Sequence, residues 1–319
     1  MDILLTGSVA YDYLMTFPGL FKEQILPERL EKISLSFLVD SMSRQRGGVA
    51  PNIAYTMALL GERPRVMATV GEDFSEYRAW LESKGVDTTL MKVVPGVYTA
   101  SFFATTDQVN AQIASFYPGA MGFAAQQTIA EARPRPDLVV VSPNDPAAMK
   151  NFAAECRELK IPYLYDPSQQ VLRLEGFELA RDLECAHFLF VNDYEFELIS
   201  KKTGHDLAAM LKHVDVLVIT RGADGSSVYA EEREYNVPVV PPERIVDPTG
   251  VGDAFRGGFL TGYAHGWSWE LCAQVGALAA TYCLEQKGPQ NHSYTRVEFV
   301  KRFRKHFDDK GRLDTLVQS

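Results

Sequence analysis

Short, almost continuously apolar segments recur along this chain and constrain its fold more than any other feature. The clearest spans residues 137–142, and similar segments lie at 3–8, 65–71 and 187–191. Strands that are apolar on both faces are typical of a parallel sheet covered by helices on both sides. Segments with helical spacing separate them, so we predict a single doubly wound α/β domain over residues 1–319, with a mostly parallel sheet flanked by helices.

Two stretches depart from this alternation of strand and helix. Residues 33–39 alternate partly, as a half-buried strand would, and residues 99–117 have the pattern of a hairpin around the polar turn 105–110. We interpret the segments 14–46 and 95–118 as a small β lid that is inserted into the domain.

The composition excludes several classes of function. The 32 basic and 41 acidic residues give a net charge of −9, which argues against a nucleic-acid-binding protein. The four cysteines form no C-x-x-C pair and the six histidines no H-E-x-x-H motif, so we expect reduced structural thiols. No apolar segment approaches the ~18 residues of a membrane span, and no basic signal region follows Met1, so we expect a cytoplasmic protein without membrane contact.

Residues 247–258 bring glycines, a helix start and a carboxylate together. The N–H groups of Gly250, Val251 and Gly252 would lack partners within the helix and, with the helix dipole, can surround a phosphate oxygen as an anion hole. A carboxylate beside such a site repels phosphate unless it has a task, so we interpret Asp253 as a general base that accepts a proton from an attacking hydroxyl. The alternative is that Asp253 only complements the helix dipole and that the glycines only form a turn.

This stretch resembles the second signature of the ribokinase-like (PfkB) carbohydrate and nucleoside kinases, Asp-Thr-x-Gly-Ala-Gly-Asp followed by Ala-Phe-x-Gly-Gly. Pro248 replaces the common Thr, and Val251 replaces the usual Ala. The resemblance implies that Asp253 deprotonates the acceptor hydroxyl and that ATP and Mg²⁺ are the cofactors. It also suggests a K⁺ site near Asp247.

The substrate side is expected at the end of the first apolar segment, where Ser8 and Asp12 follow. Open α/β sheets bind ligands at that edge. Gly47 and Gly48 permit close backbone approach, and Asn52 lies one turn into the next predicted helix. These residues are similar to the family's first signature, and the resemblance implies that Asp12 holds two vicinal hydroxyls of a sugar or ribose while Asn52 faces that sugar. Otherwise Asp12 is a turn residue and the two glycines are a plain turn before a helix.

Five further residues are candidates for contacting a purine base or the transferring phosphate. A carboxamide can pair with the donor and acceptor edge of adenine, so Gln169 or Gln170 could select a purine. The resemblance implies that the lid aromatics Phe102 and Phe116 sandwich the base and that Arg173 steadies the transferring phosphate. The alternatives are simple cross-strand packing of the two rings and solvated loop glutamines.

The nucleotide side is expected at two later strand ends. Asn192 and Glu195 match the family's Asn-x-x-Glu motif, in which Glu acts through water on Mg²⁺ and phosphate. Thr220, Gly222 and Gly225 match its Thr-x-Gly-x-x-Gly motif, which contacts the nucleotide. The alternative for Glu195 is an acidic residue in the first turn of a helix.

Two other kinds of nucleotide site are disfavoured by their motifs. No G-x-x-x-x-G-K-[ST] occurs, and Phe255 occupies the third glycine position of G-x-G-x-x-G. The resemblance to ribokinase-like kinases covers essentially the whole chain, and residues 115–121, 166–170 and 280–290 are similar to the bacterial adenosine kinase branch. It implies ATP-dependent phosphorylation of the 5′-hydroxyl of a purine nucleoside, adenosine to AMP. A ribose or fructose kinase of the same fold and a non-catalytic ligand-binding homologue remain alternatives, and the lid is a candidate for joining two subunits.

Overall fold

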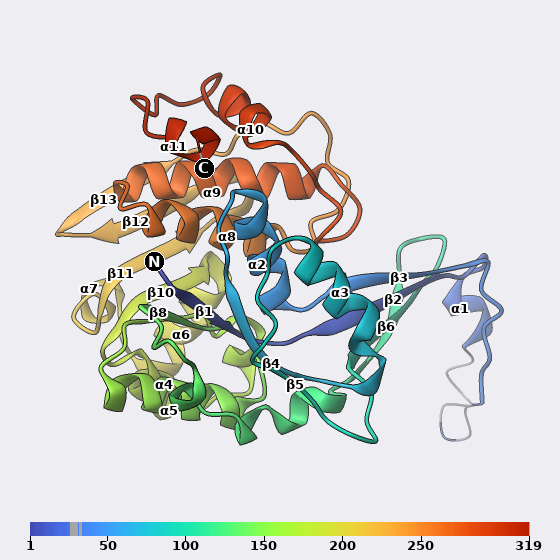
Figure 1. Cartoon of the computed structure of the whole chain (residues 1–319). Coiled ribbons are helices and arrows are strands. Elements are labelled where there is room, and N and C mark those ends of the chain that lie inside the picture. Colours follow the sequence, from blue (N-terminus) through green and yellow to red (C-terminus); the bar gives the residue numbers. More distant parts are fainter. Residues whose placement is uncertain (26–30, 32–33, 319) are drawn as a thin grey trace.

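The computed structural model describes residues 1–25, 31 and 34–318, which form two sheets and the helices around them (Figure 1). The larger, nine-stranded sheet has the order β13-β12-β11-β10-β9-β8-β1-β4-β5. Its strands are β1 (Ile3–Thr6), β4 (Arg65–Val70), β5 (Met91–Val93), β8 (Leu138–Val141), β9 (Tyr163–Tyr165), β10 (Ala186–Asn192), β11 (Val214–Thr220), β12 (Ser226–Ala230) and β13 (Arg233–Val237). All pairings from β11 to β5 are parallel, and β12 and β13 add an antiparallel edge. The predicted mostly parallel sheet is confirmed.

Helices cover both faces of this sheet because neighbouring strand residues face opposite cores. Leu5 and Val140 belong to one core, whereas Leu4 and Val139 belong to the other. The helices that pack into the first core are α2 (Val49–Leu59), α3 (Ser75–Ser83), α8 (Val251–Ala264), α9 (Trp269–Leu284), α10 (Arg296–Phe303) and α11 (Asp314–Gln318). Those that pack into the second are α4 (Pro146–Leu159), α5 (Gly176–Leu183), α6 (Asp193–Thr203) and α7 (Leu207–Met210). Short 3₁₀ turns span Glu72–Phe74, Gly119–Gln126, Ile129–Glu131, Ser168–Leu172 and Gly222–Asp224.

The smaller sheet projects from one side of the body (Figure 1). It has the order β3-β2-β6-β7, with β2 (Ala10–Thr16), β3 (Ser41–Gly47), β6 (Ala100–Thr106) and β7 (Gln112–Tyr117). The pairs β2–β3 and β6–β7 are antiparallel, whereas β2 and β6 run parallel. The short helix α1 (Phe21–Gln24) lies at its outer end. We refer to these four strands as the projecting sheet.

The predicted strand at 33–39 is wrong for the residues that can be examined. Residues 34–39 are not in a strand, and the strand of this region is β3, which starts at Ser41. The apolar alternation has another cause, because Phe37 packs edge-on against Phe17 and Phe21, with ring centroids 5.1 and 5.0 Å apart. Residues 26–30, 32 and 33 of the predicted lid segment lie outside the described residues.

A loop leads from the large sheet to α8. β13 ends at Val237, and residues 238–248 form no strand or helix. Val240 within this loop is buried, and its carbonyl accepts a hydrogen bond from Thr281 Oγ1 of α9 at 2.9 Å. The loop is therefore held by α9 rather than by strand pairing.

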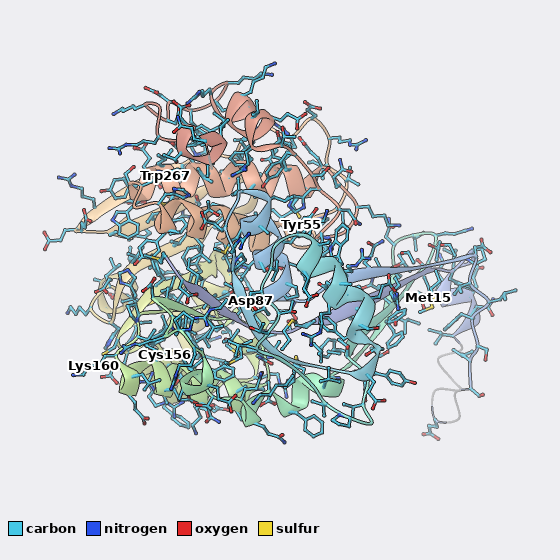
Figure 2. All side chains as sticks on the ribbon, in the orientation of Figure 1. Met15, Tyr55, Asp87, Cys156, Lys160 and Trp267 are labelled. Atoms are coloured by element: carbon cyan, nitrogen blue, oxygen red, sulfur yellow. The ribbon has the colours of Figure 1, made fainter. Side chains whose placement is uncertain are left out.

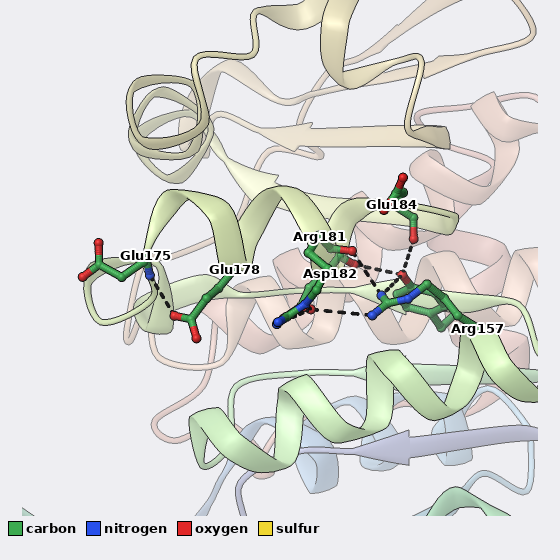
Figure 3. Close-up of polar contacts among 7 residues, drawn as sticks. Arg157, Glu175, Glu178, Arg181, Asp182 and Glu184 are labelled. Atoms are coloured by element: carbon green, nitrogen blue, oxygen red, sulfur yellow. Dashed lines mark hydrogen bonds and ion pairs between the residues drawn. The ribbon is translucent and has the colours of Figure 1, made fainter.

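A polar cluster fixes the start of β9 (Figure 3). Tyr163 donates to the carbonyl of Glu184 at 2.8 Å, and the buried Asp182 carboxylate lies 2.8 Å from Arg181 and 3.9 Å from Arg157. Arg157 belongs to α4 and Arg181 to α5, so this cluster ties both helices to the strand.

Trp267 and Cys156, both labelled in Figure 2, belong to the first and the second core. Cys156, Cys272 and Cys283 are buried and Cys185 is exposed, and all four are free thiols. Met15, in contrast, lies on the projecting sheet away from the body. Among the described residues, no helix is both long and apolar enough to span a membrane.

Candidate active site

The site is built where β1 lies between β4 and β8, which is the point at which strand order reverses. Ser8 follows β1, and its backbone N–H donates to the carbonyl of Pro143 after β8 at 2.8 Å. Its hydroxyl accepts from the N–H of Val49 at 3.2 Å. Ser8 thereby joins the end of the central strand to the start of α2.

Asp12 lies on β2 of the projecting sheet rather than at the end of β1, because the chain turns into that sheet directly after Val9. Burial and, to a smaller extent, the nearby charge of Asp247 raise the pKa of Asp12 to about 6. A Cβ on Gly47 would lie 2.6 Å from Asp12 Oδ2, so glycine at this position gives the carboxylate its space. Asp12 therefore faces the end of β3 and the segment around Asp247.

Gly48 is the N-cap of α2, with a φ of 95°, and a Cβ there would lie 2.5 Å from the carbonyl oxygen of Ser8. This close approach requires glycine. Asn52, in the first turn of α2, is 5% exposed. Its Nδ2 donates to Asp253 Oδ2 at 2.8 Å, and its Oδ1 accepts from Gln290 at 2.9 Å. The predicted sugar-binding side chain thus contacts the predicted base directly.

The start of α8 has the geometry of an anion site, with one difference from the prediction. Gly250 is the N-cap, with a left-handed φ of 78°, and α8 begins at Val251. In the described part of the chain, the N–H groups of Gly250 and Gly252 donate to no protein acceptor. The N–H of Val251, however, donates to the carbonyl of Pro248 at 3.3 Å, because the turn at Gly250 brings the two together. This bond is long, so the amide is only weakly engaged.

Asp253 lies in the first turn of α8, with 14% of its side chain exposed. Burial raises its pKa to about 6, while the charge of Arg256 and the hydrogen bond from Asn52 act in the opposite direction. Because Asn52 occupies Oδ2, Oδ1 is the oxygen that remains available for a hydroxyl proton. A base with this pKa is ionised at neutral pH and close to the value that suits general-base catalysis.

Arg256 and Asp166 adjoin Asp253, and the sequence patterns did not identify this arrangement. Asp166 follows β9 and is fully buried. Arg256 Nη2 donates to Asp166 Oδ1 at 2.9 Å, and its Nε lies 2.8 Å from Oδ2. Arg256 Nη1 lies 3.6 Å from Asp253 Oδ1. The spacing of three residues between Asp253 and Arg256 places both on one helix face and was the available signal.

The predicted base-binding aromatics stand in one cross-strand row with Asp12. Gln45, Asp12, Phe102 and Phe116 are register partners across the four strands of the projecting sheet. Register partners share a face of a sheet. Phe116 is 49% exposed, and Phe102 is partly buried. The row therefore combines a carboxylate and two accessible rings on a single face.

The two glutamines after β9 differ from each other. Gln170 Nε2 donates to the carbonyl of Asn144 at 2.9 Å, and its buried Oε1 has no hydrogen-bond partner among the described residues. Gln169 and Arg173 are exposed. Because Ser8 and Gln170 are both tied to the segment Pro143–Asn144, Gln170 lies near the end of β1.

The expected nucleotide side lies at the ends of β10 and β11, where Asn192 and Thr220 are register partners. Asn192 Oδ1 accepts from the N–H of Glu195 at 2.7 Å, and Glu195 Oε2 accepts from the N–H of Asn192 at 2.8 Å. The pair thus forms a capping box for α6 and leaves Glu195 Oε1 free of it. Gly222 and Gly225 both have positive φ, 54° and 85°, in the turn after β11.

Asp247 joins the start of the α8 loop to the segment after α9. Its carboxylate accepts from the N–H of Thr249 at 2.9 Å and from the N–H of Gly288 at 2.9 Å. Burial raises the pKa of Asp247, but these hydrogen bonds outweigh it, and the resulting pKa lies below the usual value. In the part of the chain that the structure describes, no group of three or more His, Cys, Asp or Glu side chains could hold a metal ion.

Comparisons with known proteins extend over nearly the whole chain. Residues 6–296 match the pfkB family of carbohydrate kinases. A nucleoside kinase of Methanothermobacter thermautotrophicus is 30% identical over 306 residues, covering 95% of each chain. One of Methanocaldococcus jannaschii is 28% identical over 309 residues, covering 95% of this chain and 97% of its own.

Solved structures show the same extent of similarity. The nucleoside kinase of Burkholderia thailandensis in complex with inosine is 37% identical with a TM-score of 0.85, covering 96% of this chain and 98% of its own. The same kinase in complex with ADP-inosine is 38% identical with a TM-score of 0.84, covering 96% of each chain.

Proposed function

The chain belongs to the pfkB family of carbohydrate kinases, as its signatures predicted, and from this premise we propose that it transfers the γ-phosphoryl group of ATP to the 5′-hydroxyl of a purine nucleoside. We propose adenosine as the preferred acceptor and AMP as its product. The nucleoside kinases to which the chain is similar, one of them in complex with inosine, support this substrate class.

One observation carries the proposal: Asp253 combines a free carboxylate oxygen with the start of α8, where two amides lack acceptors among the described residues. A phosphoryl group at those amides and a hydroxyl at Oδ1 would be held side by side. The row of Asp12, Phe102 and Phe116 favours a nucleoside over a simple sugar, because it offers an acceptor for hydroxyls next to flat apolar faces.

In the proposed mechanism the residues of this chain position and deprotonate the acceptor. Asp12 accepts hydrogen bonds from the ribose hydroxyls, and Phe102 and Phe116 hold the base. Asn52 orients Asp253 through Oδ2, so that Oδ1 takes the proton of the 5′-hydroxyl as this oxygen attacks phosphorus. The amides of Gly250 and Gly252, with the weakly engaged amide of Val251, stabilise the charge on the transferring group.

ATP and Mg²⁺ are the proposed cofactors. The structure of a relative with ADP-inosine supports an adenine nucleotide as the donor. Mg²⁺ keeps several waters in such sites and neutralises phosphate charge. The single free oxygen of Glu195 fits contact through water better than a protein cage. Asn192, Thr220, Gly222 and Gly225 are the proposed nucleotide contacts.

A monovalent cation near Asp247 remains a proposal from family resemblance. The ionised carboxylate of Asp247 is held in place by two backbone N–H groups, which suits a fixed cation ligand. Activity in buffers of K⁺ and of Na⁺ at equal ionic strength tests it, since a K⁺ site predicts a higher rate with K⁺.

We propose that the projecting sheet is a lid over the nucleoside and that its opposite face joins two copies. Met42, Phe103, Ile113 and Tyr117 lie on the face opposite to Asp12 and are 38–66% exposed. A second copy would cover these apolar side chains. Sedimentation equilibrium tests this, with a dimer expected for the wild type and a monomer for Ile113→Lys.

A turnover screen tests the function. The purified protein is incubated with ATP, Mg²⁺ and equal concentrations of adenosine, inosine, cytidine, ribose or fructose, and ADP formation is measured. We expect the highest kcat/KM for adenosine. Faster turnover of ribose or fructose would instead establish a sugar kinase. Calorimetric binding of adenosine without any ADP formation would identify a non-catalytic binding protein.

A further inference from the structure

Arg256 meets two carboxylates from different elements and uses a different part of its guanidinium for each. Nη2 donates to Asp166 Oδ1 at 2.9 Å, and Nε lies 2.8 Å from Oδ2 in an ion pair without hydrogen-bond geometry. Nη1 takes no part in this contact. It lies 3.6 Å from Asp253 Oδ1, and a Cβ on Gly252 would be 2.9 Å from it. The third corner of the guanidinium therefore lies against the backbone of the anion hole.

Building on the proposed function, we propose that Arg256, anchored by Asp166, is a positioning residue for phosphoryl transfer. It holds Asp253 as an oriented carboxylate and places a fixed positive charge behind the amides at the start of α8.

Arg256 Nη1 and Asp253 Oδ1 are 3.6 Å apart, which is longer than a hydrogen bond. At this distance the cation stabilises the negative charge of Asp253 without occupying the lone pair that must accept the hydroxyl proton. Asp166 maintains the separation, because it accepts a hydrogen bond from Nη2 and pairs with Nε, so the guanidinium cannot turn to pair closely with Asp253. Glycine at position 252 leaves the space that Nη1 occupies.

Titratable groups near Asp253 and Arg256 come from several elements. Arg256 lies on the same helix, Asp166 follows β9, Glu195 lies at the start of α6, and Cys283 lies on α9. Burial raises the pKa of the Cys283 thiol to about 12, so this group is neutral. Burial also raises the pKa of Asp166, while the charge of Arg256 opposes this rise and favours the ionised carboxylate. Arg256 is thus the one cation among these groups.

The test compares variants that change the charge on either side of Asp253. In Arg256→Gln the cation is lost, so the pKa of Asp253 should rise by about 1–3 units. In Asp166→Asn a neighbouring negative charge is lost and Arg256 remains, so the pKa of Asp253 should fall. Arg256→Lys keeps the charge but not the contact of two nitrogens with Asp166, so kcat should fall while the pKa of Asp253 stays close to that of the wild type. A purely structural role predicts no such opposite shifts.

Two readouts separate this inference from the proposed function. The carboxyl ¹³C signal of Asp253, assigned by its absence in Asp253→Asn, reports the pKa without any substrate. The acid limb of the pH profile of kcat/KM for adenosine should move in the same directions. If the wild type phosphorylates no nucleoside, the proposed function fails, and the ¹³C titration still decides the role of Arg256.

The inference is overturned if folded Arg256→Gln titrates Asp253 at the wild-type pH. Circular dichroism and thermal unfolding establish whether each variant folds. Should Arg256→Gln fail to fold, Asp166→Asn decides alone, and an unchanged or raised pKa of Asp253 in that variant contradicts the proposal.

Discussion

Asp253 is the residue on which the proposed chemistry depends, because one of its oxygens is held by Asn52 and the other is open. Asp253→Asn should retain adenosine binding, since Asn keeps the shape of the side chain, but should lower kcat by about 10²–10⁴-fold, because an amide cannot accept the hydroxyl proton. Steady-state kinetics and calorimetry measure the two effects separately. Glu158→Gln, at an exposed position of α4, is the matched control and should keep wild-type kcat. Wild-type turnover in Asp253→Asn would remove the assignment of the base.

Asp12 should contribute to binding rather than to the chemical step. Loss of hydrogen bonds to an ionised carboxylate costs about 1.5–3 kcal/mol, so Asp12→Asn should raise KM for adenosine about 10–100-fold with a smaller effect on kcat. The substrate 2′,3′-dideoxyadenosine provides the matched comparison. It should bind weakly to the wild type and lose little further affinity in Asp12→Asn. If the variant weakens both substrates equally, Asp12 does not hold the ribose hydroxyls.

Sequence reasoning identified these two carboxylates because each lies in a short, recognisable pattern. It could not identify the anchoring of Arg256 by Asp166, since these residues are 90 positions apart and meet only after β9 and α8 pack together. Gln170 illustrates the same limit. Its residue type suggested base recognition, whereas one end of its carboxamide is bound to the carbonyl of Asn144.

At the scale of elements, the buried parallel strands could be predicted from the sequence, whereas the strands at the edges of the sheets could not. Residues of β1, β4 and β8 are buried throughout, so their composition alone indicates their environment. The strand prediction for residues 34–39 was wrong because Phe37 packs against Phe17 and Phe21 and not into a sheet. The antiparallel hairpin of β12 and β13 was not predicted, since its strands are only partly apolar and lie at the edge.

The junction between β1 and α2 depends on Gly48, and a pair of glycine substitutions can show this. Gly48 and Gly85 have nearly the same φ, 95° and 92°, but a Cβ would clash with Ser8 only at Gly48, whereas Gly85 has open space. Gly85→Ala should therefore cost only the backbone strain, about 1 kcal/mol. Gly48→Ala should cost clearly more free energy of unfolding and should also lower kcat/KM, because α2 carries Asn52. Chemical denaturation and adenosine kinetics measure both, and equal losses of stability would contradict the argument.

At the scale of the whole molecule, the segment after α9 contacts α2, which lies far away in the sequence. Gln290 donates to Asn52, and the fully buried His292 lies against Tyr55, with its Nε2 3.4 Å from Thr56 Oγ1 of α2. Burial lowers the pKa of His292 to about 4. The same helix α2 is thus held beside Asp253 and in the interior by Gln290 and His292.

This buried histidine makes the stability of the fold depend on pH. His292 is neutral in the folded state down to about pH 4, whereas in the unfolded chain it takes up a proton below the ordinary histidine pKa of 6.5. The free energy of unfolding is therefore not reduced by His292 above pH 6.5. It falls by roughly 3 kcal/mol in all as the pH decreases from 6.5 to about 4. His292→Phe removes this proton uptake, while the acids with raised pKa values, such as Asp166, are common to both proteins. Urea unfolding at about pH 7.5 and about pH 4.5 should show that the wild type loses more stability than His292→Phe over this interval, and an equal loss would mean that His292 is not held neutral in the fold.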